Sequence, residues 1–180
     1  GAVCRFNAFR RVAPGDKIGV ALKATTPDAR IDAPRAARLA PPAAASEWLT
    51  AALKDGVPAV RYAAVETGMC LRNSQAWETA VALARKGNPD SAPYLNLIAL
   101  FGSPEEHEIV YRALRTAGLQ LPAIWALGHV GTRRAADACL AGMKHEALAR
   151  ACGEAYGWMT GADLERDGLA LEEVPPDAPA

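Results

Sequence analysis

The fold of this chain is decided by the stretch Leu119–Gly161, which reads LQLPAIWALGHVGTRRAADACLAGMKHEALARACGEAYGWMTG. This stretch predicts three short helices joined by very short turns. Glycines stand at the turns, where a residue free to adopt positive φ ends a helix, and Thr132 is placed to cap the middle helix. The helices themselves are rich in Ala, Leu, Cys and Met, so we expect them to pack on one another. The stretch contains no Ser/His/Asp set and no glycine-rich phosphate loop.

The same helix–turn–helix punctuation continues toward the N-terminus. Ser103-Pro104-Glu105-Glu106 combines a capping residue, a proline at the first helical position and acids in the first turn. Ser74 is a second predicted N-cap. Regular helices are predicted over residues 46–54, 60–71, 74–86, 92–101, 104–117, 122–130, 133–144 and 147–159, and less regular ones over 2–11, 17–24 and 34–40.

Composition agrees with an all-α protein. Hydrophobic residues make up 51% of the 180 residues but aromatic residues only 6%, and alanine, the best helix former, supplies much of the difference. No apolar run approaches the ~18 residues that span a bilayer, so no membrane span is expected. The four cysteines form no CxxC pair, and three lie among apolar helix residues. This usage favours a reducing compartment, and we predict a cytoplasmic location.

Charge is unevenly distributed although the net charge is zero. Residues 1–40 hold eight Lys/Arg and three Asp/Glu, whereas residues 160–180 hold one Arg and six Asp/Glu. The segment between them holds eleven Lys/Arg and eleven Asp/Glu. Nucleic-acid affinity comes mainly from phosphate neutralisation, so the neutral body predicts no nucleic-acid partner. The basic start is either a solvated end or a contact for an acidic partner.

Two phrases resemble the joints of HEAT repeats, in which pairs of antiparallel helices stack on the next pair. They are LKDGVPAVRYAAVETG, starting at Leu53, and ALGHVGTRRAADACL, starting at Ala126. The resemblance implies an all-α, armadillo-type α-solenoid. It predicts irregular N-terminal helices over residues 1–41, a repeat domain over 42–161, and an acidic, Pro/Ala-rich segment over 162–180. In such repeats the Asp of the turn braces it, and the Arg, here Arg61, bridges neighbouring turns.

The pattern from Ala126 to Leu169 is also similar to the C-terminal part of an uncharacterised bacterial HEAT-like family, often encoded beside type VI secretion genes. Members of that family are longer, so we expect this chain to be a fragment or a shortened member. The resemblance implies a non-catalytic protein–protein interaction module, a scaffold or adaptor, within a secretion apparatus. Two alternatives remain: an immunity protein or chaperone for a secreted toxin, and a HEAT-like metal-dependent enzyme of hydroxylase or lyase type.

The enzyme alternative depends on two His-Glu dipeptides, His107-Glu108 and His145-Glu146. Some HEAT-like hydroxylases bind two irons through such pairs, and imidazole and carboxylate suit iron. Those enzymes need four pairs at equivalent positions, whereas these two occupy different parts of their repeats. His129 has no cysteine near it in sequence to make a catalytic pair. We therefore predict no catalytic residue, no metal and no cofactor.

A protein partner is expected on the face formed by the second helix of each pair. The candidates are polar residues off the apolar stripes: Arg61, Tyr62, Asn96 and Glu154. Tyr and Arg give large contact area with polar tips, but Arg61 has a second possible role as a brace of its turn. Most aromatic residues are expected in the core, and Trp125 and Leu127 are predicted to be structural. The oligomeric state is not readable from the sequence.

Overall fold

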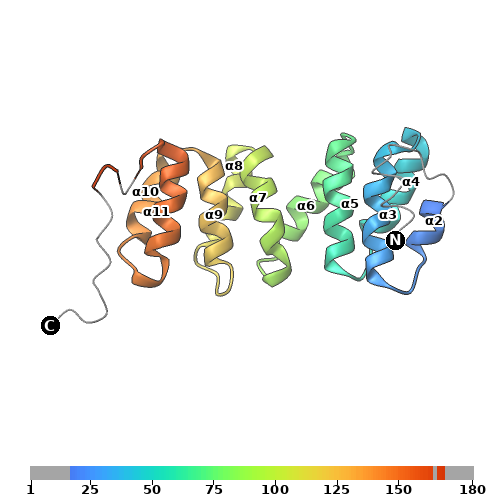
Figure 1. The fold of residues 1–180 in the computed structure, drawn as a ribbon, viewed down its shortest axis with the longest axis horizontal. Helices are drawn as coiled ribbons and strands as arrows, with labels where there is room; N and C mark the ends of the chain where they lie inside the picture. Colours follow the sequence, from blue (N-terminus) through green and yellow to red (C-terminus); the bar gives the residue numbers. More distant parts are fainter. Residues whose placement is uncertain (1–16, 164–165, 169–180) are drawn as a thin grey trace. The chain divides into compact units, whose positions relative to one another are not determined.

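The computed structural model describes residues 17–163 and 166–168; the expected helix 2–11 and most of the acidic C-terminal segment lie outside them. The described elements are ten α-helices and two short 3-10 helices (Figure 1): α2 Lys17–Leu22, α3 Pro27–Ala36, η1 Ala37–Leu39, α4 Pro42–Ala52, α5 Pro58–Cys70, α6 Ser74–Arg85, η2 Pro89–Ser91, α7 Ala92–Phe101, α8 Pro104–Ala113, α9 Gln120–Val130, α10 Arg133–Gly142 and α11 Glu146–Thr160.

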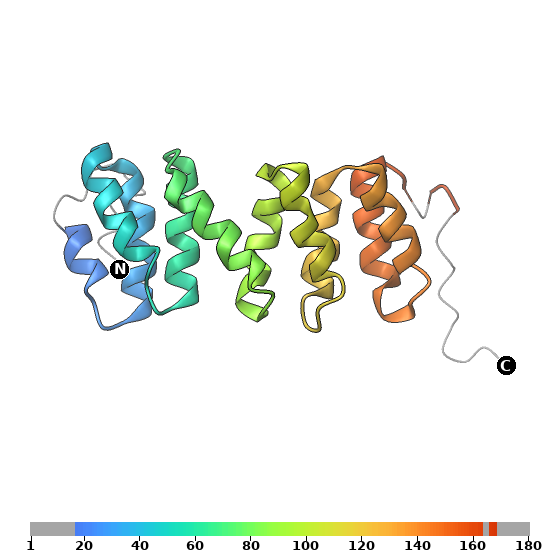
Figure 2. The same cartoon turned by 180° about the vertical axis from the view of Figure 1, so that it is seen from behind.

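The predicted all-α class is confirmed for this part of the chain, which contains no strand. The view from behind shows helices and turns in the same succession (Figure 2). Among the described helices, none has both the length and the apolar content needed to cross a membrane.

Local capping chemistry explains why several helices begin and end where the sequence predicts. Glu106 N donates to Ser103 Oγ at 3.3 Å and Ser103 N donates to the Glu106 carboxylate at 2.8 Å, which is a complete capping box at the start of α8. Thr132 Oγ1 accepts from Ala135 N at 3.2 Å and caps α10. Gly131 and Gly161 follow α9 and α11 with φ of 64° and 73°, the left-handed region that glycine adopts at helix ends.

The start of α4, the cap of α6 and the extent of α3 differ from the prediction; α4 begins at Pro42, four residues before the predicted start at residue 46. Asn73, not Ser74, caps α6, because its side-chain oxygen accepts from Ala76 N at 3.1 Å. In the N-terminal region a single helix, α3, runs through Pro34. A separate helix was predicted over residues 34–40, whereas Pro34 lies inside α3 and residues 37–39 form the 3-10 helix η1. Pro27 begins α3, in the first-turn position where proline was expected to open a helical turn, and the side chain of Pro34 is fully buried.

The chain divides into two compact units, residues 1–94 and residues 95–180, and the boundary falls within α7. In the first unit, α5 packs against α3, α4 and α6, and α3 also packs against α2. One core cluster here consists of small side chains around a single large one, Ile18, with Leu22 and Trp48 packed against it; the other buried members are Ala21, Ala33, Ala36, Ala37 and Ala45.

In the second unit, α9 is the central helix and packs against α8, α10 and α11, while α10 also packs against α11. Ile124 and Leu127 of α9 are buried, as the predicted apolar stripe requires, and Trp125 is half-buried. The buried neighbours on the other helices are mostly small or β-branched: Ile109, Val110, Ala113, Ala135, Cys139, Ala151, Cys152 and Ala155.

Close approach of neighbouring helices depends on glycine at particular contacts. A Cβ on Gly68 of α5 would collide with the Cβ of Ala76 on α6. A Cβ on Gly142, at the end of α10, would collide with Sγ of Cys152 on α11. These helices are therefore in contact through small residues, at a separation that a larger side chain would prevent.

Replacement of Leu127 by Ala should destabilise the protein by roughly 2–5 kcal/mol, because a fully buried leucine leaves a cavity when it is truncated. Its side chain is 1% exposed. Leu121→Ala on the same helix is the matched control, since Leu121 is 48% exposed. The measurement is urea unfolding followed by circular dichroism, and equal midpoints for the two variants would contradict the assigned packing of α9.

Candidate functional site

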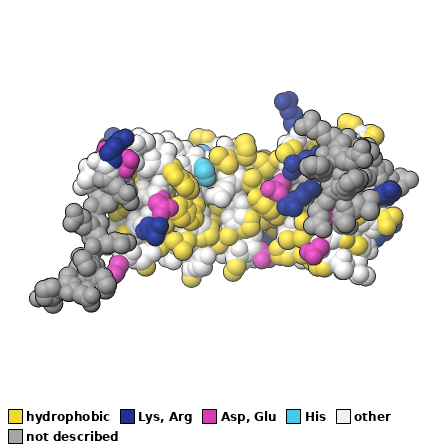
Figure 3. Space-filling view, in the orientation of Figure 1, with side chains coloured by type: hydrophobic (Ala, Val, Ile, Leu, Met, Phe, Trp, Pro, Cys, Tyr) yellow, Lys and Arg dark blue, Asp and Glu magenta, His cyan; other side chains and the backbone are white. Residues whose placement is uncertain are grey.

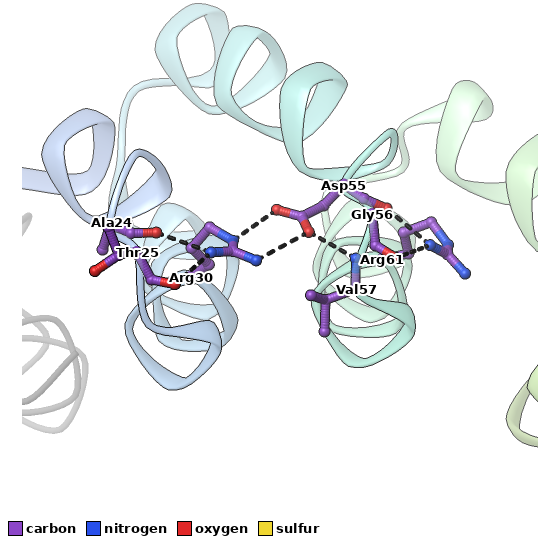
Figure 4. A network of polar contacts seen from close by, with 7 residues as sticks. All are labelled: Ala24, Thr25, Arg30, Asp55, Gly56, Val57 and Arg61. Carbon is purple, nitrogen blue, oxygen red and sulfur yellow. Dashed lines mark hydrogen bonds and ion pairs between the residues drawn. The ribbon is translucent and has the colours of Figure 1, made fainter.

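Asp55 links two successive turns of the first unit (Figure 4). Arg30 Nε donates to Asp55 Oδ2 at 2.9 Å, and Val57 N donates to Asp55 Oδ1 at 2.8 Å. Arg30 also donates through Nη1 to the carbonyl oxygens of Ala24 and Thr25, at 2.8 and 3.1 Å. The carboxylate thus holds its own turn together and connects it to the turn before α3.

Arg61 makes the equivalent contacts one turn further on. Its Nη1 donates to the carbonyl oxygens of Asp55 and Gly56 at 2.8 and 3.0 Å, and its Nη2 lies 3.7 Å from Oδ2 of Asp90 (Figure 4 draws the carbonyl contacts). Its side chain is 17% exposed. Arg30 and Arg61 each lie three residues after the proline that begins their helix. Of the two roles considered for Arg61, brace of its turn or contact for a partner, these contacts favour the brace.

Tyr62 lies beside the brace and remains available on the surface. It is half-buried, and its ring meets that of Tyr94 edge-to-face, with centroids 5.6 Å apart and planes at 69°. Burial, and to a lesser extent the Glu66 carboxylate, raise the pKa of Tyr62. Burial also raises the pKa of Tyr94. Both phenols are therefore neutral at physiological pH, and Tyr62 can offer its ring and hydroxyl to a partner.

The other two predicted contact residues lie in the second unit. Asn96 is exposed on α7. Glu154 is exposed on α11, where Arg150 Nε donates to its carboxylate at 3.0 Å within the same helix. The structure therefore places Arg61 and Tyr62 next to each other in one unit and assigns Asn96 and Glu154 to the other. Whether any of the four contacts a partner remains a prediction.

A more prominent surface feature is formed by Trp125 and His129 of α9 with Trp158 of α11, which we call the aromatic cluster. The Trp158 ring centre lies 5.2 Å from that of Trp125 and 5.8 Å from that of His129, with interplanar angles of 34° and 30°. Trp158 is 58% exposed. Figure 3 shows hydrophobic side chains on the surface of the side of this unit that carries α9 and α11.

Gly128 creates the space in which Trp158 lies. A Cβ at this position would come 3.0 Å from Cε3 of Trp158 and 3.5 Å from the backbone of Ala155. The indole is therefore laid across α9 between the positions of Trp125 and His129, with much of its surface open to solvent. Sequence reasoning missed this arrangement because it assigned most aromatic residues to the core. The available signal was the four-residue spacing of Trp125 and His129, with Gly128 beside them.

The two His-Glu dipeptides lie in different structural positions: His107-Glu108 is inside α8, and His145-Glu146 is at the start of α11. Arg134 binds both carboxylate oxygens of Glu108 and lies 3.9 Å from the Tyr111 ring centre. This hydrogen bonding lowers the pKa of Glu108. His145 is exposed at the start of α11. Among the described residues, no group of three or more His, Cys, Asp or Glu side chains is arranged to hold a metal ion.

Cys139 of α10 and Cys152 of α11 are buried thiols, whereas Cys70 of α5 is exposed. Burial, together with the neighbouring Cys152, raises the pKa of Cys139 to about 11. Burial also raises the pKa of Cys152. Because the thiolate is the nucleophile, neither buried thiol is activated for catalysis.

Comparison with family models, with curated proteins and with solved structures found no match for this chain.

Iodoacetamide at pH 8 should alkylate Cys70 in the native protein much faster than Cys139 or Cys152. The reason is that the two buried thiols stay protonated and covered, and a raised pKa keeps the Cys139 thiolate scarce until the pH approaches about 11. Peptide mass spectrometry over a time course measures the three rates, with Cys70 as the internal control. Native labelling of Cys139 as fast as that of Cys70 would contradict the assigned burial.

The Asp55→Ala variant should lose roughly 1–3 kcal/mol of unfolding free energy, because Arg30 and the Val57 N–H lose their shared acceptor. The side chains of Arg30 and Asp55 are 18% and 15% exposed. Asp137→Ala is the control, since Asp137 lies 3.9 Å from Arg133 and both side chains are exposed to solvent. This substitution should lower the free energy of unfolding by only about 0–1 kcal/mol. The measurement is chemical denaturation, and equal losses in the two variants would show that the Asp55 contacts do not brace the unit.

Proposed function

We propose that this chain is a non-catalytic protein–protein interaction module, a scaffold or adaptor, built as an α-solenoid of HEAT-like helix pairs. The repeated brace supports the repeat architecture, because Arg30 and Arg61 occupy the same position after a helix-starting proline and bind the carbonyls of the preceding turn. The contacts of α5 with α3 and of α9 with α11 join helices that alternate along the chain, as stacked pairs require.

The observation that carries the interaction role is the exposure of Trp158 within the aromatic cluster. An indole is a large apolar surface, and leaving it in water forgoes the free energy that its burial would contribute. Tryptophan is also enriched among the residues that contribute most to binding at interfaces. Ring contacts with Trp125 and His129 hold Trp158 in place, so a partner that covers its exposed surface orders few further torsions.

The first unit contributes a second candidate contact through Tyr62. Its ring is held by Tyr94, and its neighbour Arg61 is committed to the turn carbonyls. In this proposal Arg61 keeps Tyr62 in position and Tyr62 makes the contact. The similarity of the sequence to secretion-linked HEAT-like proteins makes components of a type VI secretion apparatus the first partners to examine.

The test is affinity capture with the tagged chain, followed by binding measurements with each captured protein after purification. Trp158→Ala should lower the affinity for a genuine partner at least tenfold, which is the effect expected when a tryptophan at the centre of an interface is truncated. Tyr62→Ala, Asn96→Ala and Glu154→Arg test the other predicted contacts in the same assay. Leu140→Ala, an exposed apolar residue on α10, is the matched control and should leave affinity unchanged.

Circular dichroism and the unfolding midpoint establish that each variant is folded. Arg61→Glu separates the two roles of Arg61. If Arg61 is a brace, the substitution lowers the stability of the protein. If Arg61 contacts the partner, the substitution lowers affinity while the unfolding midpoint stays unchanged. The proposal is wrong if every purified captured protein binds the Trp158→Ala and Tyr62→Ala variants as tightly as the unmodified chain.

A further inference from the structure

Three successive turns of the first unit lie in a row at one end of its helices. Arg30 binds carbonyl oxygens of the turn before α3 and, through Nε, the Asp55 carboxylate in the turn before α5 (Figure 4). Arg61 binds carbonyl oxygens of the turn before α5, and its Nη2 lies 3.7 Å from Oδ2 of Asp90 in the turn after α6. The two brace arginines, Arg30 and Arg61, therefore hold the three turns together along one edge of the unit.

A lysine lies at the same place in each of these turns, within two residues of the end of the preceding helix. Lys23 follows α2, Lys54 follows α4 and Lys86 follows α6, and all three side chains are exposed. We call these three residues the lysine edge. The dipole of each preceding helix favours a cation at its C-terminal end. Among the described residues, none of the three ammonium groups makes an ion pair or a side-chain hydrogen bond, so they are available to an anionic group.

The carboxylates of the same three turns compensate little of this charge. Asp55 is 15% exposed and bound by one brace arginine, and Asp90 lies beside the other. Asp28 is exposed in the first turn of α3, where the helix N-terminus favours an acid. Arg85, next to Lys86, adds a further exposed cation without a side-chain partner among the described residues. The edge therefore carries an excess of available positive charge.

We propose that the lysine edge binds an acidic segment of a partner protein. A single exposed ion pair contributes little to affinity, so binding requires several carboxylates that reach the row together, as the acidic side chains of one segment do. A peptide can place its carboxylates away from Asp28 and Asp90, whereas a nucleic acid carries a phosphate at every residue. This inference rests on the proposed interaction function and names the chemistry of a partner at a second surface.

The probe is a fluorescein-labelled peptide of five Asp-Ser repeats, titrated with the full chain and followed by anisotropy. A peptide of five Asn-Ser repeats, equally long but uncharged, is the control ligand. We expect the acidic peptide to bind at least tenfold more tightly than the control at an ionic strength of about 0.1 M, where the Debye length is about 10 Å. The preference should disappear at about 1 M, where the Debye length is about 3 Å.

The double variant Lys54→Gln/Lys86→Gln should lower the affinity for the acidic peptide about tenfold, because it removes two cations of the row. Arg38→Gln/Arg72→Gln is the matched control, since it removes the same charge from exposed side chains. Helices α3 and α5 begin at the lysine edge, and these two arginines lie beyond their opposite ends. The control variant should bind the acidic peptide as tightly as the unmodified chain. Unfolding midpoints establish that both variants are folded.

Equal affinity for the two peptides, or unchanged affinity in Lys54→Gln/Lys86→Gln, would overturn the proposal. An equal loss in both double variants would also overturn it, because the response would then follow net charge alone. Tighter binding of a labelled ten-residue oligothymidine than of the acidic peptide would make nucleic acid the occupant instead.

A second copy of the chain is the remaining occupant, because residues 160–180 hold six Asp/Glu. If light scattering shows a dimer that Lys54→Gln/Lys86→Gln dissociates, the second copy covers the lysine edge and the partner proposal is overturned. The interaction function itself fails by a separate result, which is unchanged binding of captured proteins to the Trp158→Ala and Tyr62→Ala variants.

Discussion

Small side chains at the helix contacts are the constraint on which the rest of this structure depends. Gly68 faces Ala76 between α5 and α6, and Gly142 faces Cys152 between α10 and α11. Alanine is the most frequent residue of the buried core, and at these contacts the helices pack through close backbone approach. The same rule operates at Gly128, whose missing side chain leaves room for the Trp158 indole on the outside of α9.

Polar contacts then fix the turns between the packed helices. In the first unit, Arg30 and Arg61 satisfy turn carbonyls that would otherwise depend on water, and Asp55 joins the two sets of contacts. In the second unit, Arg134 connects α10 to α8 through Glu108 and the face of Tyr111. Arginine suits both tasks because its planar guanidinium donates in several directions at once. Arg30, Arg61 and Arg134 are therefore engaged in contacts within the fold.

Local chemistry made most of the helix boundaries predictable. The Ser103 and Thr132 caps depend on neighbours within four residues, and both are found as predicted. The extent of α3 was not predicted, because a proline inside a helix is unfavourable from local chemistry, whereas Pro34 lies inside α3 and is fully buried in the packed structure. The exposure of Trp158 was unreadable for a similar reason, since it depends on how α11 is rotated against Gly128. The brace role of Arg61 was readable as a possibility, because the sequence from Leu53 resembles a HEAT joint, in which the arginine bridges neighbouring turns.

The central claim is that the face of α9 and α11 carrying the aromatic cluster is a binding surface. It is tested most directly by ¹⁹F NMR of the chain labelled with 5-fluorotryptophan, since the sequence has only four tryptophans and each signal is assigned by replacing one of them. On saturation with a purified binding partner, the account predicts that the Trp158 signal shifts most, that Trp125 follows, and that Trp48, packed in the first unit, stays in place. An unchanged Trp158 signal at full saturation would contradict the account.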